Sequence, residues 1–229
     1  MLELKSLSFS YDGCEAVLKN INFQINKYDS LALIGANGSG KTTLFLTLSG
    51  LYKYGGKIFL NKTELKDYKP KVLRKKIGMI FQNVEEQLFM PTVYDELKLS
   101  LVQHYGAADE EKINYYLQCF NIEHLKNRKI ENLSAGEKKK TALVSILIYS
   151  PDILLLDEPT AFLDLKGCAE LLRIINEQKI TKIISTHNYH FAKECCGKTL
   201  ILKKGETFAF GDTGNIINNA DLLRNAEII

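Results

Sequence analysis

Hydrophobic and polar residues alternate over two stretches near the start of the chain, 2–11 and 16–26. Alternation at every second position is typical of strands with one buried face, so both stretches are predicted strands. A short, continuous apolar run at 30–35 predicts a strand that is buried on both faces. Further strands are predicted at 56–61, 76–82, 153–158, 182–187, 199–204 and 206–211.

Helical signals lie between these strands. A helix is predicted at 41–49, because Gly50 follows it as a stop signal. Thr92 and Gly106 bound another predicted helix, the first as its N-terminal cap and the second as its end. Further helices are predicted at 109–120, where apolar residues follow a helical spacing, from 134 onward, at 165–178, and as short segments in the tail from 212.

Buried strands alternate with helices over most of the chain. This order implies an α/β fold whose parallel sheet is covered on both faces. No strand is evident from 83 to 150, so that stretch is predicted to be a helical lobe. The chain is therefore predicted to form a single domain, 1–229, in which 1–82 and 151–229 make the α/β core and 83–150 an inserted lobe.

The composition narrows the classes of function. A net charge of +3 does not indicate a nucleic-acid-binding protein, and the basic run at 66–76 is better explained as a solvated face than as a phosphate-backbone site. Five cysteines without a C-x-x-C pair argue against disulfides or zinc and favour a reducing cytosol. No signal peptide or membrane-spanning run is evident, so any membrane role is expected to be peripheral.

The sequence "GANGSGKT" fits the phosphate-binding pattern G-x-x-x-x-G-K-[ST] between a predicted strand and a predicted helix. Glycines let backbone N–H groups surround phosphate oxygens, and the helix N-terminus adds its positive end. Lys41 is expected to contact the β- and γ-phosphates, and the Thr42 hydroxyl to bind Mg²⁺. The predicted nucleotide-binding residues here are Gly35, Ala36, Asn37, Gly38, Ser39, Gly40, Lys41, Thr42 and Thr43.

Two carboxylates, Asp157 and Glu158, end the predicted strand "ILLLDE". Ligands bind at the carboxyl ends of strands in open α/β sheets, and buried carboxylates there require a cation or a chemical role. Asp157 is predicted to be a partner of Mg²⁺, and Glu158 to orient or deprotonate a water molecule aimed at the γ-phosphate. The alternative is that both carboxylates cap the following helix.

The stretch "LSAGEKKK", 133–140, begins a helix with the capping-box pair Ser134 and Glu137. Three lysines follow in the first turns, where the positive end of the helix dipole disfavours them. The sequence leaves two interpretations open: the helix start is only a cap, or it addresses an anion.

Taken together, these motifs resemble the ATP-binding subunit of ABC transporters over nearly the whole chain. "LSAGE" is similar to the signature "LSGGQ", "STH" ends at a switch histidine, His187, and Gln82 stands at the Q-loop. "AFLD", ending at Asp164, is similar to the D-loop. Tyr11, with Val17 behind it, stands where an aromatic residue stacks on adenine.

The resemblance implies a P-loop ABC ATPase fold: a mostly parallel core sheet, an antiparallel N-terminal β subdomain and an inserted helical signature lobe. It implies that two ATPase subunits, identical or different, enclose ATP and Mg²⁺ head to tail on the cytoplasmic face of a membrane, bound to an integral membrane transporter subunit. The catalytic residues would be Lys41, Gln82, Glu158 and His187, and the metal would be held by Thr42, Gln82 and Asp157. Ser134, Ala135, Gly136 and Glu137 would act on the partner's ATP, with Asp164 near the dimer seam.

The stretch "FQNVEEQLFMPTVYDEL" resembles "FQNPDDQLF…TVEDEV" of the energy-coupling-factor ATPases, which serve uptake of vitamins and of nickel or cobalt. Val84 departs from that pattern, which has proline. We expect apolar surface for a membrane partner's short helix from Phe89, Met90, Val93 and Tyr94.

Two rival functions remain: an ABC ATPase of DNA repair, translation or cluster assembly, and a module that dimerises on ATP without hydrolysis. Glu158 and His187 argue against the second. Within the signature, Ala135 replaces a glycine and would be strained if the position needs a positive φ. Glu137 replaces glutamine and would bring negative charge near the site.

Overall fold

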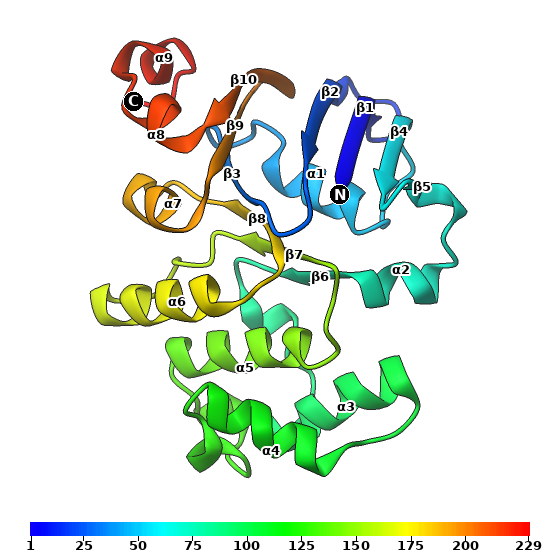
Figure 1. The fold of residues 1–229 in the computed structure, drawn as a ribbon, viewed down its shortest axis with the longest axis vertical. Coiled ribbons are helices and arrows are strands. Elements are labelled where there is room, and N and C mark those ends of the chain that lie inside the picture. Colours follow the sequence, from blue (N-terminus) through cyan, green and yellow to red (C-terminus); the bar gives the residue numbers. More distant parts are fainter.

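The computed structural model describes residues 1–229 and contains two β-sheets (Figure 1). The smaller sheet is antiparallel, with strand order β2-β1-β4-β5. One face of its strands is buried, as the alternating sequence predicts: Leu4, for example, pairs with Phe23 on one side and Ile58 on the other. Its strands are β1 (Leu2–Ser10), β2 (Ala16–Ile25), β4 (Gly55–Leu60) and β5 (Thr63–Glu64).

The larger sheet has the strand order β10-β9-β3-β8-β7-β6. Its neighbouring strands from β9 to β6 are parallel, and β10 joins β9 as an antiparallel edge. The predicted α/β class, with a mostly parallel sheet and an antiparallel N-terminal sheet, is confirmed. The strands are β3 (Ser30–Ile34), β6 (Ile77–Ile80), β7 (Ile153–Asp157), β8 (Thr181–Ser185), β9 (Lys198–Lys203) and β10 (Glu206–Asp212).

The helices predicted from the sequence are present. Thr92 caps α3 by accepting a hydrogen bond from the Asp95 N–H, and Gly106 ends it in the left-handed conformation, at φ 84°. The helices with a predicted counterpart are α1 (Lys41–Leu48), α3 (Val93–Tyr105), α4 (Glu110–Cys119), α5 (Ala135–Leu147), α6 (Leu165–Glu177), α8 (Thr213–Ile217) and α9 (Ala220–Asn225).

Two helices have no counterpart in the sequence prediction. Helix α2 (Pro70–Lys76) lies within the basic run and buries only Leu73, so it lacks an apolar stripe. Helix α7 (Tyr189–Cys195) has seven residues, too few for a clear period, and is capped by Asn188. Four 3₁₀ turns complete the structure: η1 (Leu65–Asp67), η2 (Val84–Glu86), η3 (Glu123–Leu125) and η4 (Ile130–Asn132).

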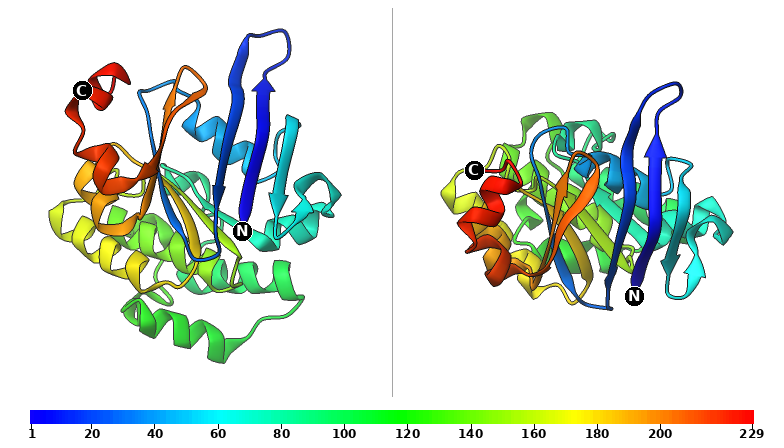
Figure 2. Two further views of the ribbon diagram at one scale, coloured as in Figure 1. Left: turned by 45° about the horizontal axis from the view of Figure 1, so that its top comes forward. Right: turned by 90° about the horizontal axis from the view of Figure 1, so that it is seen from above.

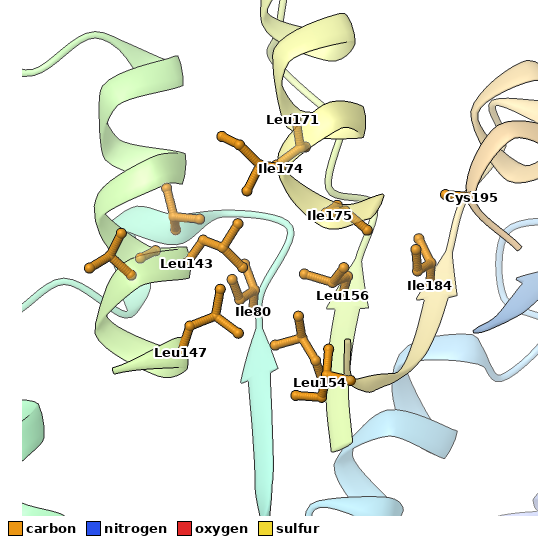
Figure 3. Packing of buried hydrophobic residues seen from close by; sticks show 14 of the residues in the cluster. Ile80, Leu143, Leu147, Leu154, Leu156, Leu171, Ile174, Ile175, Ile184 and Cys195 are labelled. Atoms are coloured by element: carbon orange, nitrogen blue, oxygen red, sulfur yellow. The ribbon is translucent and has the colours of Figure 1, made fainter. Parts of the chain in front are cut away.

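The larger sheet separates two hydrophobic cores. Along β7, Ile153 and Leu155 face the core shared with α1 and the smaller sheet, whereas Leu154 and Leu156 face the core beneath α5 and α6 (Figure 3). Both faces are therefore apolar, which explains the uninterrupted apolar runs of the central strands. Helices α3 and α4 extend this second core at the end of the molecule far from the smaller sheet (Figure 1).

The C-terminal helices α8 and α9 lie beside the β9–β10 edge in all views (Figure 2). Their N-termini are capped by Asp212 and Asn219, which accept hydrogen bonds from backbone N–H groups. No helix of the structure has the length and apolar character that crossing a bilayer requires.

Candidate functional site

The loop between β3 and α1 needs glycine for two physical reasons. Gly40 is the N-cap of α1, and its φ of 104° lies in a region that side chains disfavour. A Cβ atom on Gly35 would lie 2.4 Å from the carbonyl oxygen of Leu202, so the neighbouring backbone excludes any side chain there. The loop therefore turns tightly around the N-terminus of α1, the geometry that binds anions.

The Lys41 side chain reaches from the start of α1 back to the beginning of this loop. Its Nζ donates to the carbonyl oxygens of Gly35, at 2.7 Å, and Ala36, at 3.2 Å, and lies 3.4 Å from His187 Nε2. Burial lowers the pKa of Lys41, and the carboxylates Glu158 and Asp157 oppose that shift. A buried ammonium held by carbonyl oxygens can exchange those acceptors for phosphate oxygens, which carry full charge.

Asp157 binds the start of α1 and the end of β8. Its Oδ2 accepts a hydrogen bond from Thr42 Oγ1 at 2.8 Å, and its Oδ1 accepts one from Ser185 Oγ. Asp157 as a residue is only 4% exposed. A hydroxyl and a carboxylate in contact are hard oxygen ligands, which Mg²⁺ combines with substrate phosphates, so these residues fit that ion.

Glu158 is held in an uncommon conformation, with a φ of 43°. Its N–H donates to the carbonyl oxygen and the hydroxyl of Ser185, and the His187 N–H donates to its Oε2 at 3.2 Å. A left-handed residue other than glycine costs about 1–2 kcal/mol, so the surrounding contacts must hold Glu158 in place.

The second carboxylate oxygen of Glu158, Oε1, is buried and accepts no hydrogen bond, although it lies 3.3 Å from His187 Nε2. The distance is short enough, but the atoms are not aligned as a hydrogen bond. An unsatisfied carboxylate oxygen beside a cavity is a natural acceptor for a water proton. The alternative that these carboxylates cap the next helix is wrong, because Asp164 caps α6 through the Gly167 N–H.

These side chains converge on one cavity of about 480 Å³ at the carboxyl ends of the parallel strands. Its lining is polar apart from one valine. Within the lining, the Glu158 side chain lies next to His187, and the Asp157 side chain lies next to Thr42. The lining residues are Val17, Asn37, Gly38, Gly40, Lys41, Thr42, Thr43, Gln82, Asp157, Glu158 and His187.

Some predicted residues do not line this cavity, among them Gly35, Ala36 and Ser39 of the phosphate loop. Tyr11 is 42% exposed and packs edge-on against Phe9 and Tyr52, with ring centroids 4.9 and 5.6 Å away. Asp164 is used as the cap of α6. The signature residues, 134–137, also lie outside the lining. One subunit therefore assembles the phosphate loop with Gln82, both carboxylates and His187, but not with the signature.

The signature forms the expected capping box. The Ser134 hydroxyl accepts from the Glu137 N–H, and the Glu137 carboxylate accepts from the Ser134 N–H at 2.7 Å. The hydrogen bonds that the Glu137 carboxylate accepts, above all from the Ser134 N–H and also from the Ser134 hydroxyl, lower the pKa of Glu137, and Arg128 lies 3.5 Å from the carboxylate. The strain considered for Ala135 is absent, because Ala135 and Gly136 are helical and neither has a positive φ.

Each of the three lysines after the capping box has a partner within the chain. Lys138 forms an ion pair with Glu85 of η2, and Lys140 one with Glu170 of α6 at 2.5 Å. Lys139 is 3% exposed and donates to the carbonyl oxygen of Gln82 at 3.1 Å. Burial lowers the pKa of Lys139 to about 8, with Asp157 opposing. The charges of Lys138 and Lys140 are therefore offset by carboxylates on other elements, whereas Lys139 has a carbonyl oxygen as its hydrogen-bond acceptor.

Two residues of the site were missed by the sequence reasoning. Ser185 contacts both Asp157 and Glu158, and its signal was a buried polar residue at a strand end, two positions before His187. Lys139 contacts Gln82, 57 positions away, and its only signal was a lysine in an unfavourable part of a helix.

The structure exposes only some of the residues expected to form the partner-binding surface. Phe89 is 76% exposed and Met90 half-buried, but Val93 is fully buried and Tyr94 packs against the core. The prediction for Val93 was wrong because α3 turns that position toward the interior. A groove of about 450 Å³ is lined by both chain neighbours of Phe89 but not by Phe89 itself; its lining residues are Glu85, Leu88, Met90, Pro91, Lys129, Ile130, Glu131 and Lys138.

The chain is similar to known proteins over its whole length. Residues 18–161 match the family described as ABC transporter. An ABC transporter ATP-binding protein of Archaeoglobus fulgidus is 38% identical over 100% of this chain and 98% of its own. The energy-coupling factor transporter ATP-binding protein EcfA of Methanothermobacter thermautotrophicus is 35% identical over 100% of this chain and 76% of its own.

Two solved structures share the fold at significant identity. The structure of cbiO1 from Clostridium perfringens, part of the ABC transporter complex cbiONQ, has a TM-score of 0.86 and 31% identity, covering 99% of this chain and 94% of that one. A dimeric ATP-binding cassette in a post-hydrolysis state, bound to ADP and Pi, has a TM-score of 0.81 and 26% identity, covering 93% and 99%. The chain therefore belongs to the ABC transporter family, as an ATP-binding subunit that hydrolyses ATP.

Proposed function

We propose that this ATPase powers an energy-coupling-factor importer, whose cargo is a metal ion such as cobalt or nickel, or a vitamin. The observation that carries the proposal is the stretch 81–97, where the sequence similar to those ATPases exposes Phe89 between Leu88 and Met90, two residues that line a groove. The likeness to EcfA and to cbiO1 supports the same branch. The subunit would then sit peripherally on the cytoplasmic face of the membrane.

Within one subunit, we propose that the cavity holds the ATP phosphates. Backbone N–H groups of the phosphate loop and the Lys41 ammonium would bind phosphate oxygens, and Val17 in the lining would lie toward the adenine. Tyr11, which lies outside the lining and packs against Phe9 and Tyr52, is proposed to stack on the adenine from the cavity's edge. Thr42, Asp157 and Gln82 would hold Mg²⁺, which would neutralise part of the negative charge on the phosphates. These residues line one cavity, and Thr42 already contacts Asp157.

Glu158 is proposed as the group that orients the attacking water and accepts its proton. Its Oε1 is free of hydrogen bonds, and its Oε2 is fixed by the backbone of the switch histidine. His187 would contact the γ-phosphate and keep the Glu158 side chain in position, because its ring lies 3.3 Å from Oε1. A rigid acceptor at this place lowers the barrier without reorganising during reaction.

The signature is proposed to act on ATP held by a second ATPase subunit, identical or different. It does not line the cavity of its own subunit, and its helix begins with N–H groups that lack intrahelical acceptors. The dimeric relative supports this arrangement. Gly136→Asp should remove turnover at the site it completes while ATP still binds to the loop 35–43. Unaltered turnover would refute the assignment.

Docking to the membrane subunit is proposed at Phe89, Met90 and the adjoining groove. The buried Glu96 carboxylate fixes this surface, since its Oε2 accepts from the N–H groups of Phe89 and Met90, each at 2.9 Å. An exposed aromatic side chain on a backbone held in this way is typical of an interface anchor.

Co-purification from membranes tests the proposed function. Phe89→Asp and Met90→Asp should abolish recovery of the membrane subunit while ATP binding stays at the wild-type level. Tyr28→Asp is the matched control, because Tyr28 is also an exposed aromatic, at 59%, but lies in the turn between β2 and β3. Undiminished recovery of the membrane subunit with both variants would refute the docking proposal. The importer class is decided separately, by identifying the recovered subunit and measuring which cargo it takes up in liposomes.

A further inference from the structure

Lys139 is a buried cation that the chemistry described so far does not use. Its side chain is among the few charged ones that are almost wholly inaccessible, at 3% exposure. Its ammonium donates one hydrogen bond within the protein, to the carbonyl oxygen of Gln82. An ammonium group has three donors, so this site satisfies the charge poorly.

A poorly satisfied buried charge does not serve stability. Burying an ammonium group without a paired carboxylate costs free energy, and an apolar side chain of the same length would fill the space at least as well. The neighbouring lysines differ in this respect, because Lys138 and Lys140 each pair with a carboxylate on another element. The contact of Lys139 with Gln82 therefore needs a reason other than folding.

The position of Lys139 supplies that reason. It lies in α5, little more than one turn after Ser134, and Gln82 lies two residues after β6. Further along α5, Leu143 and Leu147 pack beside Ile80 at the end of β6 (Figure 3). Lys138 also holds Glu85 in the 3₁₀ turn that follows Gln82. The start of α5 and the loop 82–86 are thus joined at two consecutive lysines.

We propose that Lys139 is a positioning residue, which holds the Gln82 backbone in the nucleotide cavity and makes it follow the N-terminus of α5. The inference rests on the proposed function, in which Gln82 acts on the ATP of its own subunit and Ser134 to Gly136 on the ATP of the partner. A contact of the signature with the partner's nucleotide then moves Gln82 in the neighbouring site. One hydrogen bond within one chain links the two ATP sites.

Lys139→Met tests the link, because methionine keeps the length and apolar volume of the lysine stem but cannot donate. Without nucleotide, amide hydrogen exchange at 82–86 should become about tenfold faster, which corresponds to about 1.4 kcal/mol for a hydrogen bond from a charged group. Turnover should fall by a similar factor with the KM for ATP within about twofold, because the phosphate loop is untouched.

Lys140→Met is the matched control. Lys140 is the next residue of the same helix and pairs with Glu170 rather than with the loop. In Lys140→Met, amide exchange at 82–86 and kcat should stay at the wild-type level. Lys139→Arg, which keeps the charge and the donors, should recover most of the turnover that Lys139→Met loses. Wild-type exchange and kcat in Lys139→Met would overturn the inference, as would an equal loss in Lys140→Met.

Two further measurements keep the outcome clear. The urea midpoint of Lys139→Met should equal or exceed that of the wild type, because the substitution removes a desolvated charge. A lower midpoint, with faster amide exchange throughout the protein, would mean that Lys139 has a structural role and would also overturn the inference. Gln82→Ala separates the two proposals: wild-type kcat in that variant would refute the catalytic role of Gln82, whereas exchange at 82–86 reports the Lys139 contact alone.

Discussion

Replacing Gly40 by alanine should damage the phosphate loop by an amount that the structure lets us estimate. Gly40 has a φ of 104°, and a left-handed residue with a side chain costs about 1–2 kcal/mol. The new Cβ would lie 2.9 Å from Leu18 Cδ2, which can move, and 3.3 Å from the carbonyl oxygen of Val17 in β2. The crowding adds to this cost, whereas the lower conformational entropy of alanine in the unfolded chain offsets part of it. We therefore expect the unfolding free energy to fall by about 1–3 kcal/mol.

Urea unfolding and titration with a fluorescent ATP analogue measure the two consequences. Unfolding should show the stability loss, and ATP affinity should fall at least about tenfold, or 1.4 kcal/mol, because strain relief moves the N–H groups that face the phosphates. Gly38→Ala is informative beside it, since Gly38 has a φ of 78° but a Cβ there meets nothing within 4 Å. It should lose the conformational part of the stability only.

Gly197→Ala serves as a neutral control, because Gly197 has no positive φ and a Cβ there also meets nothing within 4 Å. If Gly40→Ala matched the wild type in both measurements, the reasoning from backbone geometry would be refuted. An equal loss of stability in Gly38→Ala would refute the part that rests on crowding against β2.

Three further predictions test other parts of the structure. Thr42→Val removes the hydroxyl that contacts Asp157, and should raise the Mg²⁺ concentration for half-maximal ATPase activity at least about tenfold, with little change in the urea midpoint. Burial raises the pKa of Glu96, so the ionised carboxylate opposes folding. At neutral pH the wild type should therefore be no more stable than Glu96→Gln. As the pH falls through the raised pKa, the unfolding free energy of the wild type, measured in urea, should rise relative to that of the variant. Leu156→Ala, at a side chain that is 1% exposed, should lower the unfolding free energy by about 2–5 kcal/mol.

The sequence predicted the core strands and most helices because their burial pattern is local. The central strands are apolar on both faces, and helices such as α3 carry their own caps, Thr92 and Gly106. Helix α2 could not be predicted in this way, since it buries one leucine and is held by its neighbours. Val93 was misplaced for a related reason: exposure depends on the direction of α3 against the core, which periodicity alone does not fix.

The candidate site divides in the same manner. Lys41, Asp157 and Glu158 were predictable from the phosphate-loop pattern and the end of a buried strand, whereas Gln82 and His187 were predicted through the resemblance to ABC ATPases. The structure brings all five together, because the carboxyl ends of the parallel strands meet at one edge of the sheet. The partners that hold these side chains were not predictable. Contacts such as Lys139 to Gln82 join residues far apart in the chain, and a lysine carries no sign of its acceptor.

The ATPase rate of Glu158→Gln, beside that of the wild type, tests the central claim most directly. Glutamine keeps the shape of the side chain and the contact with the His187 N–H but is a poor proton acceptor. Hydrolysis should fall at least about 100-fold, the contribution of a positioned general base, while ATP still binds and ATP-bound dimers accumulate in light scattering. Hydrolysis at the wild-type rate in this variant would contradict the account.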